Sequence, residues 1–125
     1  MKTIKQKHLI NALPEEVFTA LTNSFTIELW SGYPAIMEPR ENTEFSIFEG
    51  DITGMNILII PNKKLVQEWY FGEQNEKSIV TIELTGNKQG TKVALEHTNI
   101  PDEDIENIET GWKVYYWEAI KEFFK

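Results

Sequence analysis

Residues 101–125 read PDEDIENIETGWKVYYWEAIKEFFK, and the pattern of this stretch predicts an amphipathic helix. At about 100° per residue, its main apolar side chains share an arc of roughly 140°. They are Ile105, Ile108, Trp112, Tyr115, Tyr116, Ala119, Ile120 and Phe123. A face so wide and aromatic needs a large surface to cover it. No other segment has a comparable helical pattern, so we expect the helix to pack on a β-sheet.

Two residues of this stretch do not fit a regular helical face. Glu109 falls inside the apolar arc, and Gly111 interrupts the helix at a cost of about 0.5–1 kcal/mol relative to alanine. Either Gly111 allows a close approach to another backbone, or a short unwound turn resets the phase and moves Glu109 outward. Trp117 and Phe124 lie on the flank of the arc, where we expect them to be exposed unless other helices cover them.

The chain before this helix predicts one strand, two short helices and then a series of strands. Residues 2–11 alternate in polarity as a strand does, and PEEVFTALTN at 14–23 opens with a proline and two glutamates that suit a first helical turn. A second helix is expected at 24–30, with a cap at Asn23 or Ser24. Between 35 and 98, short strands joined by turns indicate an antiparallel meander. The order predicts an α+β fold, in which a curved antiparallel sheet of about six or seven strands wraps around the long C-terminal helix.

Composition limits the classes of partner. The 125 residues suit a single domain spanning 1–125, and a formal net charge of -8 argues against nucleic acid or an anionic membrane surface as the main partner. The absence of cysteine excludes disulfides, thiol catalysis and cysteine-ligated metal. Lysines at positions 2, 5 and 7 interrupt the only candidate signal peptide, so we expect a cytoplasmic protein.

No motif with catalytic spacing is found. The sequence lacks a glycine-rich phosphate loop, a nucleophile elbow and a zinc-binding helix motif. His8 and His97 are the only histidines, and a metal site built on them would need carboxylate ligands as well. We therefore predict that the protein is not an enzyme and holds neither a metal nor a cofactor.

Four strings of the sequence resemble one known family. They are PEEVFTALTN at 14–23, FSIFEGDITGMNILIIPNKKLVQEWYF at 45–71, TKVALEHTNIP at 91–101 and GWKVYYWEAIKEFF at 111–124. Together they resemble the C-terminal domain of the activator of the heat-shock protein 90 ATPase, a member of the START-like (SRPBCC) helix-grip superfamily. Leu13 and Asn42 depart from the family pattern, at a helix cap and at a turn. The eukaryotic activator also has an N-terminal domain that contacts the chaperone, whereas this chain begins at the grip domain.

The resemblance implies two functions. The first is non-enzymatic binding of a small apolar ligand between the helix and the sheet. The expected site residues are His8, Ile47, Trp69, Phe71, Leu95, His97, Trp112, Tyr116 and Ile120. The second is a co-chaperone-like interaction with the heat-shock protein 90 chaperone and its ATPase, carried by the acidic surface and exposed aromatic residues. A helix and sheet that simply fill the space between them remain the alternative to a ligand pocket.

Overall fold

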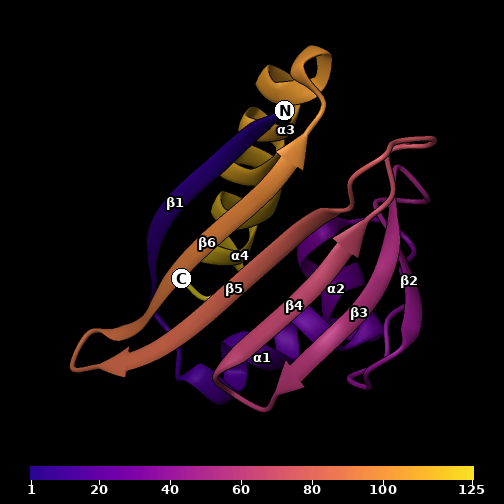
Figure 1. The fold of residues 1–125 in the computed structure, drawn as a ribbon. Helices are drawn as coiled ribbons and strands as arrows, with labels where there is room; N and C mark the ends of the chain where they lie inside the picture. The colour runs from indigo at the N-terminus through magenta and orange to yellow at the C-terminus, as the bar shows by residue number, and fades with distance from the viewer.

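One six-stranded antiparallel sheet organises the chain, whose residues 1–125 are all described by a computed structural model (Figure 1). The strand order is β1-β6-β5-β4-β3-β2, so β2 to β6 form a meander and β1 is added at the edge beside β6. The strands are β1 (Lys2–Ile10), β2 (Thr43–Ile47), β3 (Ile52–Ile60), β4 (Lys64–Trp69), β5 (Ser78–Asn87) and β6 (Gly90–Ile100). Ile36 forms only an isolated bridge to Ser46, so the sheet has six strands, within the expected six or seven.

Two short helices follow β1, as the sequence predicts. α1 (Pro14–Thr22) begins where the Leu13 N–H donates to Glu16 Oε1 at 2.9 Å. α2 (Ser24–Ser31) begins where the Asn23 side chain accepts from the Thr26 N–H at 2.9 Å, so Asn23 is the cap. α2 ends at Gly32, whose φ of 83° suits glycine.

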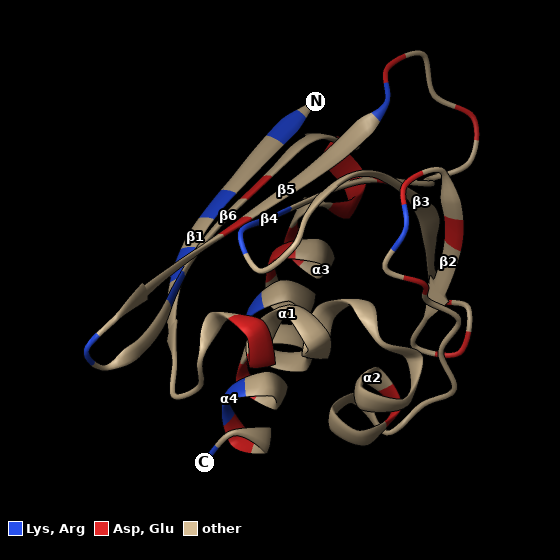
Figure 2. Cartoon of the chain, turned by 90° about the horizontal axis from the view of Figure 1, so that it is seen from below, with Lys and Arg blue, Asp and Glu red and all other residues tan.

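The C-terminal helix lies against the concave face of the curved sheet (Figures 1 and 2). It follows a short 3₁₀ turn, η1 (Asp102–Asp104), and consists of α3 (Ile105–Thr110), a π-helical segment η2 (Gly111–Glu118) and α4 (Ala119–Phe123). α2 packs against α4, which places the two short helices beside the lower half of the long one. The α+β helix-grip architecture expected from the sequence is confirmed. None of these helices has both the length and the apolar character needed to cross a membrane.

The π-helical segment changes which side chains face the sheet. A π-helix bonds residue i to i+5, so residues five apart lie above one another. Trp112 and Trp117 stack in this way, with ring centroids 6.1 Å apart and planes 16° apart. Trp117 is therefore fully buried, whereas Tyr115 is 66% exposed and Phe123 is 40% exposed. The expectations that Trp117 is exposed and that the other two are buried were wrong, because they assumed 3.6 residues per turn throughout.

Gly111 marks the start of this wider turn. A Cβ at Gly111 would meet no atom within 4 Å, so the glycine does not serve a close approach to another backbone. The phase of the helix is reset, as the second interpretation proposed, although a π-helical segment does this rather than an unwound turn. Glu109 is accordingly exposed.

Gly54 in β3 does serve a close approach. A Cβ there would overlap the carbonyl oxygen of Glu68 on β4 and come within 2.8 Å of the Phe45 ring on β2. Phe45 pairs with Gly54 and packs its ring over it, so the missing side chain makes room for a buried aromatic residue. The sheet next to the β2–β3 connection therefore depends on this glycine.

Gly54→Ala is expected to destabilise the fold by about 1–3 kcal/mol, because the added methyl group overpacks a buried site. Gly111→Ala is the matched control, since its helical φ of -58° and open surroundings accept a Cβ. It should be neutral or stabilise the fold by up to about 1 kcal/mol. Urea denaturation of both variants measures the difference, and equal losses of stability would contradict these assignments.

Candidate ligand-binding cleft

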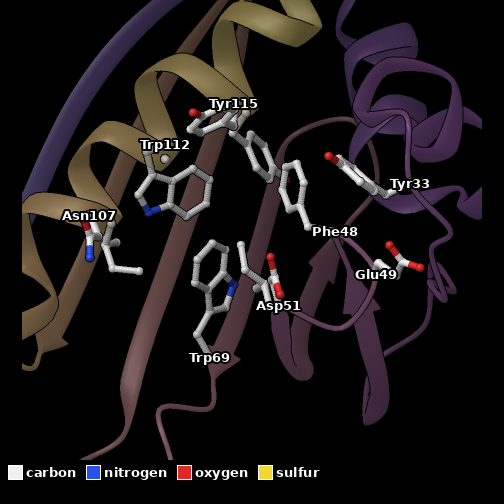
Figure 3. Close-up of a pocket in the computed structure, with 12 residues that line it drawn as sticks. Tyr33, Phe48, Glu49, Asp51, Trp69, Asn107, Trp112 and Tyr115 are labelled. Atoms are coloured by element: carbon white, nitrogen blue, oxygen red, sulfur yellow. The ribbon is translucent and has the colours of Figure 1, made fainter.

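A cleft of about 640 Å³ lies between the C-terminal helix, the loop joining β2 to β3 and the end of β4 (Figure 3). Its floor is buried, because Trp69, Trp112 and Tyr116 expose almost none of their surface. Its rim is open, with Tyr33 48% exposed and Tyr115 even more so. The lining residues are Tyr33, Phe48, Glu49, Asp51, Ile52, Trp69, Asn107, Ile108, Gly111, Trp112, Tyr115 and Tyr116.

Two stacked tryptophans form the floor of the cleft. The rings of Trp69, from β4, and Trp112, from η2, have centroids 4.6 Å apart and planes 20° apart. Tyr116 lies one helical turn further on, with its ring centroid 4.6 Å from that of Trp112. Such aromatic contacts add about 0.5–1.5 kcal/mol each beyond the burial of area. The sheet and the helix are joined here through ring faces.

The indole N–H of Trp112 is held by a buried chain of hydrogen bonds. It donates to His97 Nδ1 at 2.9 Å, which places the single proton of the neutral imidazole on Nε2. His97 Nε2 then donates to Ser78 Oγ at 2.7 Å, and the Ser78 hydroxyl donates to the Thr98 carbonyl oxygen at 3.0 Å. Burial lowers the pKa of His97 to about 3, so the ring is neutral at neutral pH. Its two hydrogen bonds then decide which ring nitrogen carries the proton.

A second buried chain holds the indole N–H of Trp69. It donates to Gln67 Oε1 at 3.0 Å, and Gln67 Nε2 donates to Asn56 Oδ1 at 2.9 Å. Asn56 Nδ2 in turn donates to the Glu38 carbonyl oxygen at 3.2 Å. Gln67 and Asn56 are fully buried, so an unmet bond in this chain would cost about 1–3 kcal/mol. Both indole N–H groups are therefore occupied inside the protein.

The β2–β3 loop forms the rim opposite the helix. Phe48, Glu49 and Gly50 are consecutive residues with φ of 54°, 56° and 90°. Left-handed backbone costs roughly 1–2 kcal/mol for an L-residue, and a bulky aromatic rarely adopts it. Here the Phe48 ring is held between Trp30 and Tyr116, with centroid distances of 6.0 and 6.4 Å. The contacts that offset the strain also place this ring on the wall of the cleft.

His8 lies at the other end of the helix and is packed rather than free. Its Nε2 donates to Gln6 Oε1 at 2.9 Å, and its Nδ1 accepts from Lys121 Nζ at 3.0 Å. The ring stacks on Trp117, with centroids 5.5 Å apart. Burial, together with the charges of Lys121 and Lys113, lowers the pKa of His8 to about 4. This stacking closes the space between β1 and the helix.

The structure brings three of the nine predicted site residues together in the cleft: Trp69, Trp112 and Tyr116. The other six do not line it. His97 lies beneath the floor, His8 lies near Trp117, and the remaining four pack in or against the core, namely Ile47, Phe71, Leu95 and Ile120. The two histidines lie too far apart to share a ligand. His97 on β6 pairs with Ile4 of β1, whereas His8 lies further along β1 and pairs with Val93. No group of three or more His, Asp or Glu side chains is placed to hold a metal ion.

Sequence reasoning missed most of the cleft wall. Tyr33, Phe48 and Asp51 lie in connections, where no periodicity indicates the direction of a side chain. Tyr115 was assigned to the buried face because the π-helical turn was not foreseen. One signal was available, since an aromatic residue directly before Glu49-Gly50 at the end of a strand is unusual in a turn.

A long helix packed on the concave face of a curved antiparallel sheet, with a cleft between them, defines the helix-grip class of domain. The chain belongs to the family described as Activator of Hsp90 ATPase homolog 1-like protein, whose model matches residues 11–125. The resemblance expected from the sequence is thereby confirmed.

Individual relatives agree with this assignment. The chain is 31% identical to human Activator of 90 kDa heat shock protein ATPase homolog 1 over 98% of its length, and 29% identical to the homolog of Dictyostelium discoideum over 98%. It spans only about a third of these relatives, 36% and 33% respectively. An HSP90 activator from Plasmodium falciparum has a similar structure, with a TM-score of 0.88, 28% identity, and coverage of 98% of this chain and 96% of that one. The Aha1 dimer from Colwellia psychrerythraea shares the fold at a TM-score of 0.87 and 19% identity, covering 99% of this chain and 96% of that one.

Lowering the pH from 7 to 5 is expected to destabilise the folded state. Histidine in the unfolded chain protonates near pH 6.5, whereas burial keeps His97 neutral down to about pH 3. Between these values the unfolded state binds more protons, so the free energy of unfolding falls as the pH falls. For His97 the slope approaches about 1.4 kcal/mol per pH unit below 6.5.

Urea denaturation at several pH values, in the parent and in His97→Gln, isolates this contribution. Glutamine still offers an oxygen to the Trp112 N–H but does not titrate. The variant should be less stable at pH 7 and should lose less stability on acidification. An unchanged slope would show that His97 is not held neutral.

Proposed function

We propose that this protein is a non-enzymatic binding domain that holds a small, flat apolar ligand in the cleft. The observation that carries the proposal is the stacked Trp69–Trp112 floor. The two rings cover each other and expose almost none of their surface, and both indole N–H groups are bonded within the protein, so the floor is apolar and has no free donor. Eight of the twelve lining residues are hydrophobic, which suits burial of an apolar molecule.

Size and position support the same proposal. Sites for small molecules typically have volumes of about 300–1,000 Å³, and the cleft falls within that range at about 640 Å³. Core side chains such as Ile120 and Leu95 fill the rest of the space between helix and sheet. The proposed site is therefore the end of the grip near the β2–β3 loop. Neither histidine lines it.

Tyr115→Ala tests the cleft without disturbing the core. Tyr115 lines the cleft and is largely exposed. Its loss should weaken the binding of neutral aromatic probes such as indole and naphthol by about five- to tenfold. Val114→Ala is the matched control, because Val114 is an exposed neighbour that does not line the cleft. Calorimetric titration and thermal shift would report binding. Absence of any saturable binding, or equal affinities in the two variants, would count against the proposal.

A second candidate function is regulation of the heat-shock protein 90 chaperone. The support is that two relatives, the human protein at 31% identity and the Plasmodium falciparum protein at 28%, are named as activators of this chaperone. Trp117, which the sequence placed at such an interface, is buried and is not available for it. The exposed apolar residues Phe25 and Leu29, one turn apart on α2, are better placed to contact a protein.

If the domain acts on the chaperone, it should bind the purified chaperone and change its rate of ATP hydrolysis. The double variant Phe25→Ala/Leu29→Ala should weaken both effects by about tenfold, since buried apolar contacts dominate such interfaces. Leu9→Ala, an exposed residue on β1, is the control. An unaltered ATPase rate in the presence of saturating domain would exclude this second function.

A further inference from the structure

We infer that the cleft selects an organic cation, an apolar molecule that carries an amine or quaternary ammonium group, over a neutral molecule of the same shape. This inference rests on the proposed binding function and names the class of ligand. It is carried by three features of the cleft: its aromatic lining, the two carboxylates at the rim, and the absence of a basic side chain among the lining residues.

Aromatic side chains surround the cleft on several sides. Six aromatic side chains line it, from η2, from β4, from the β2–β3 loop and from the segment after α2: Trp69, Trp112, Tyr116, Tyr115, Phe48 and Tyr33. The face of an aromatic ring is its negative part, and tryptophan attracts a cation most strongly. Aromatic enclosures of this kind are the usual binding mode for quaternary ammonium groups.

The positive edges of the two tryptophans are turned away from the cleft. The N–H of Trp112 donates to His97, and the N–H of Trp69 donates to Gln67. These bonds hold the N–H of each indole inside the protein. The N–H is the part of the ring that would repel a cation. A ligand in the cleft therefore meets no free indole donor, and the aromatic surface open to it is that of the exposed rim residues Tyr33 and Tyr115.

The charged groups at the rim are both acidic. Glu49 and Asp51 line the cleft, and neither takes part in any ion pair within the chain. Figure 3 draws the carboxylate of Asp51 in the space beside Trp69 and Phe48, while Glu49 lies further out below Tyr33. Lys113 follows Trp112 in the sequence but does not line the cleft. The negative charge at the rim is thus left without a partner from this chain.

Basic side chains that could neutralise the rim are engaged elsewhere. Lys121 is bonded to His8 at the far end of the helix, and Arg40 pairs with Glu38. The net charge of -8 adds a long-range field of the same sign. Local and overall electrostatics therefore both favour a positively charged ligand.

Two probes of the same shape but different charge test this inference directly. 4-Hydroxyphenyltrimethylammonium and 4-tert-butylphenol have the same shape and differ in one positive charge. We expect the cation to bind at least about tenfold more tightly in calorimetric titration, with a preference that declines as salt is added. Asp51→Asn should lower the affinity for the cation about fivefold and change the affinity for the neutral phenol by less than about twofold.

Glu83→Gln provides the matched control. It removes one negative charge from the opposite face of the sheet, since the flanking Ile82 and Leu84 point into the core. It should leave the preference unchanged. Equal binding of the two probes would overturn the inference while the proposed binding function stands, whereas failure of both probes to bind would overturn both. A preference that survives Asp51→Asn combined with Glu49→Gln would show that the cation does not bind in the cleft.

Discussion

The stacking of Trp69 on Trp112 is the contact on which the rest of the structure depends. It joins β4 to the C-terminal helix, and each ring is held in place by a buried chain of hydrogen bonds that ends on the backbone. These chains account for the buried polar residues Asn56, Gln67 and His97, which would otherwise be costly in an apolar interior. The aromatic contact supplies attraction, and the polar chains define one orientation for each ring.

The π-helical segment explains why one end of the grip is filled and the other is open. It turns Trp117 toward β1, where the indole stacks on His8 and the space closes. The same rotation turns Tyr115 outward, so the helix presents Trp112 and Tyr116 to the cleft with Tyr115 at its rim. Segments of this type often occur at functional sites, and here the segment supplies four of the twelve residues that line the cleft, Gly111, Trp112, Tyr115 and Tyr116.

The cleft and the exposed apolar residues of α2 lie on different surfaces of the molecule. The cleft is lined by η2, β4 and the β2–β3 loop, whereas the exposed apolar residues of α2 face away from the core. A ligand in the cleft and a protein on α2 would therefore not compete directly. The strained turn at Phe48 contacts Trp30 of α2, so the two surfaces are connected through packed rings.

The sequence by itself determined the order of the elements, a helix cap at Asn23 or Ser24, the antiparallel meander and the long aromatic helix, because these depend on local chemistry and periodicity. It also placed Trp69, Trp112 and Tyr116 on inner faces, which the structure confirms. The turn of the helix after Gly111 was decided only by tertiary structure, since α- and π-bonding differ little locally and packing on the sheet selects between them. The cleft wall at Tyr33, Phe48 and Asp51 was likewise set by long-range contacts, because connections have no periodicity that orients a side chain.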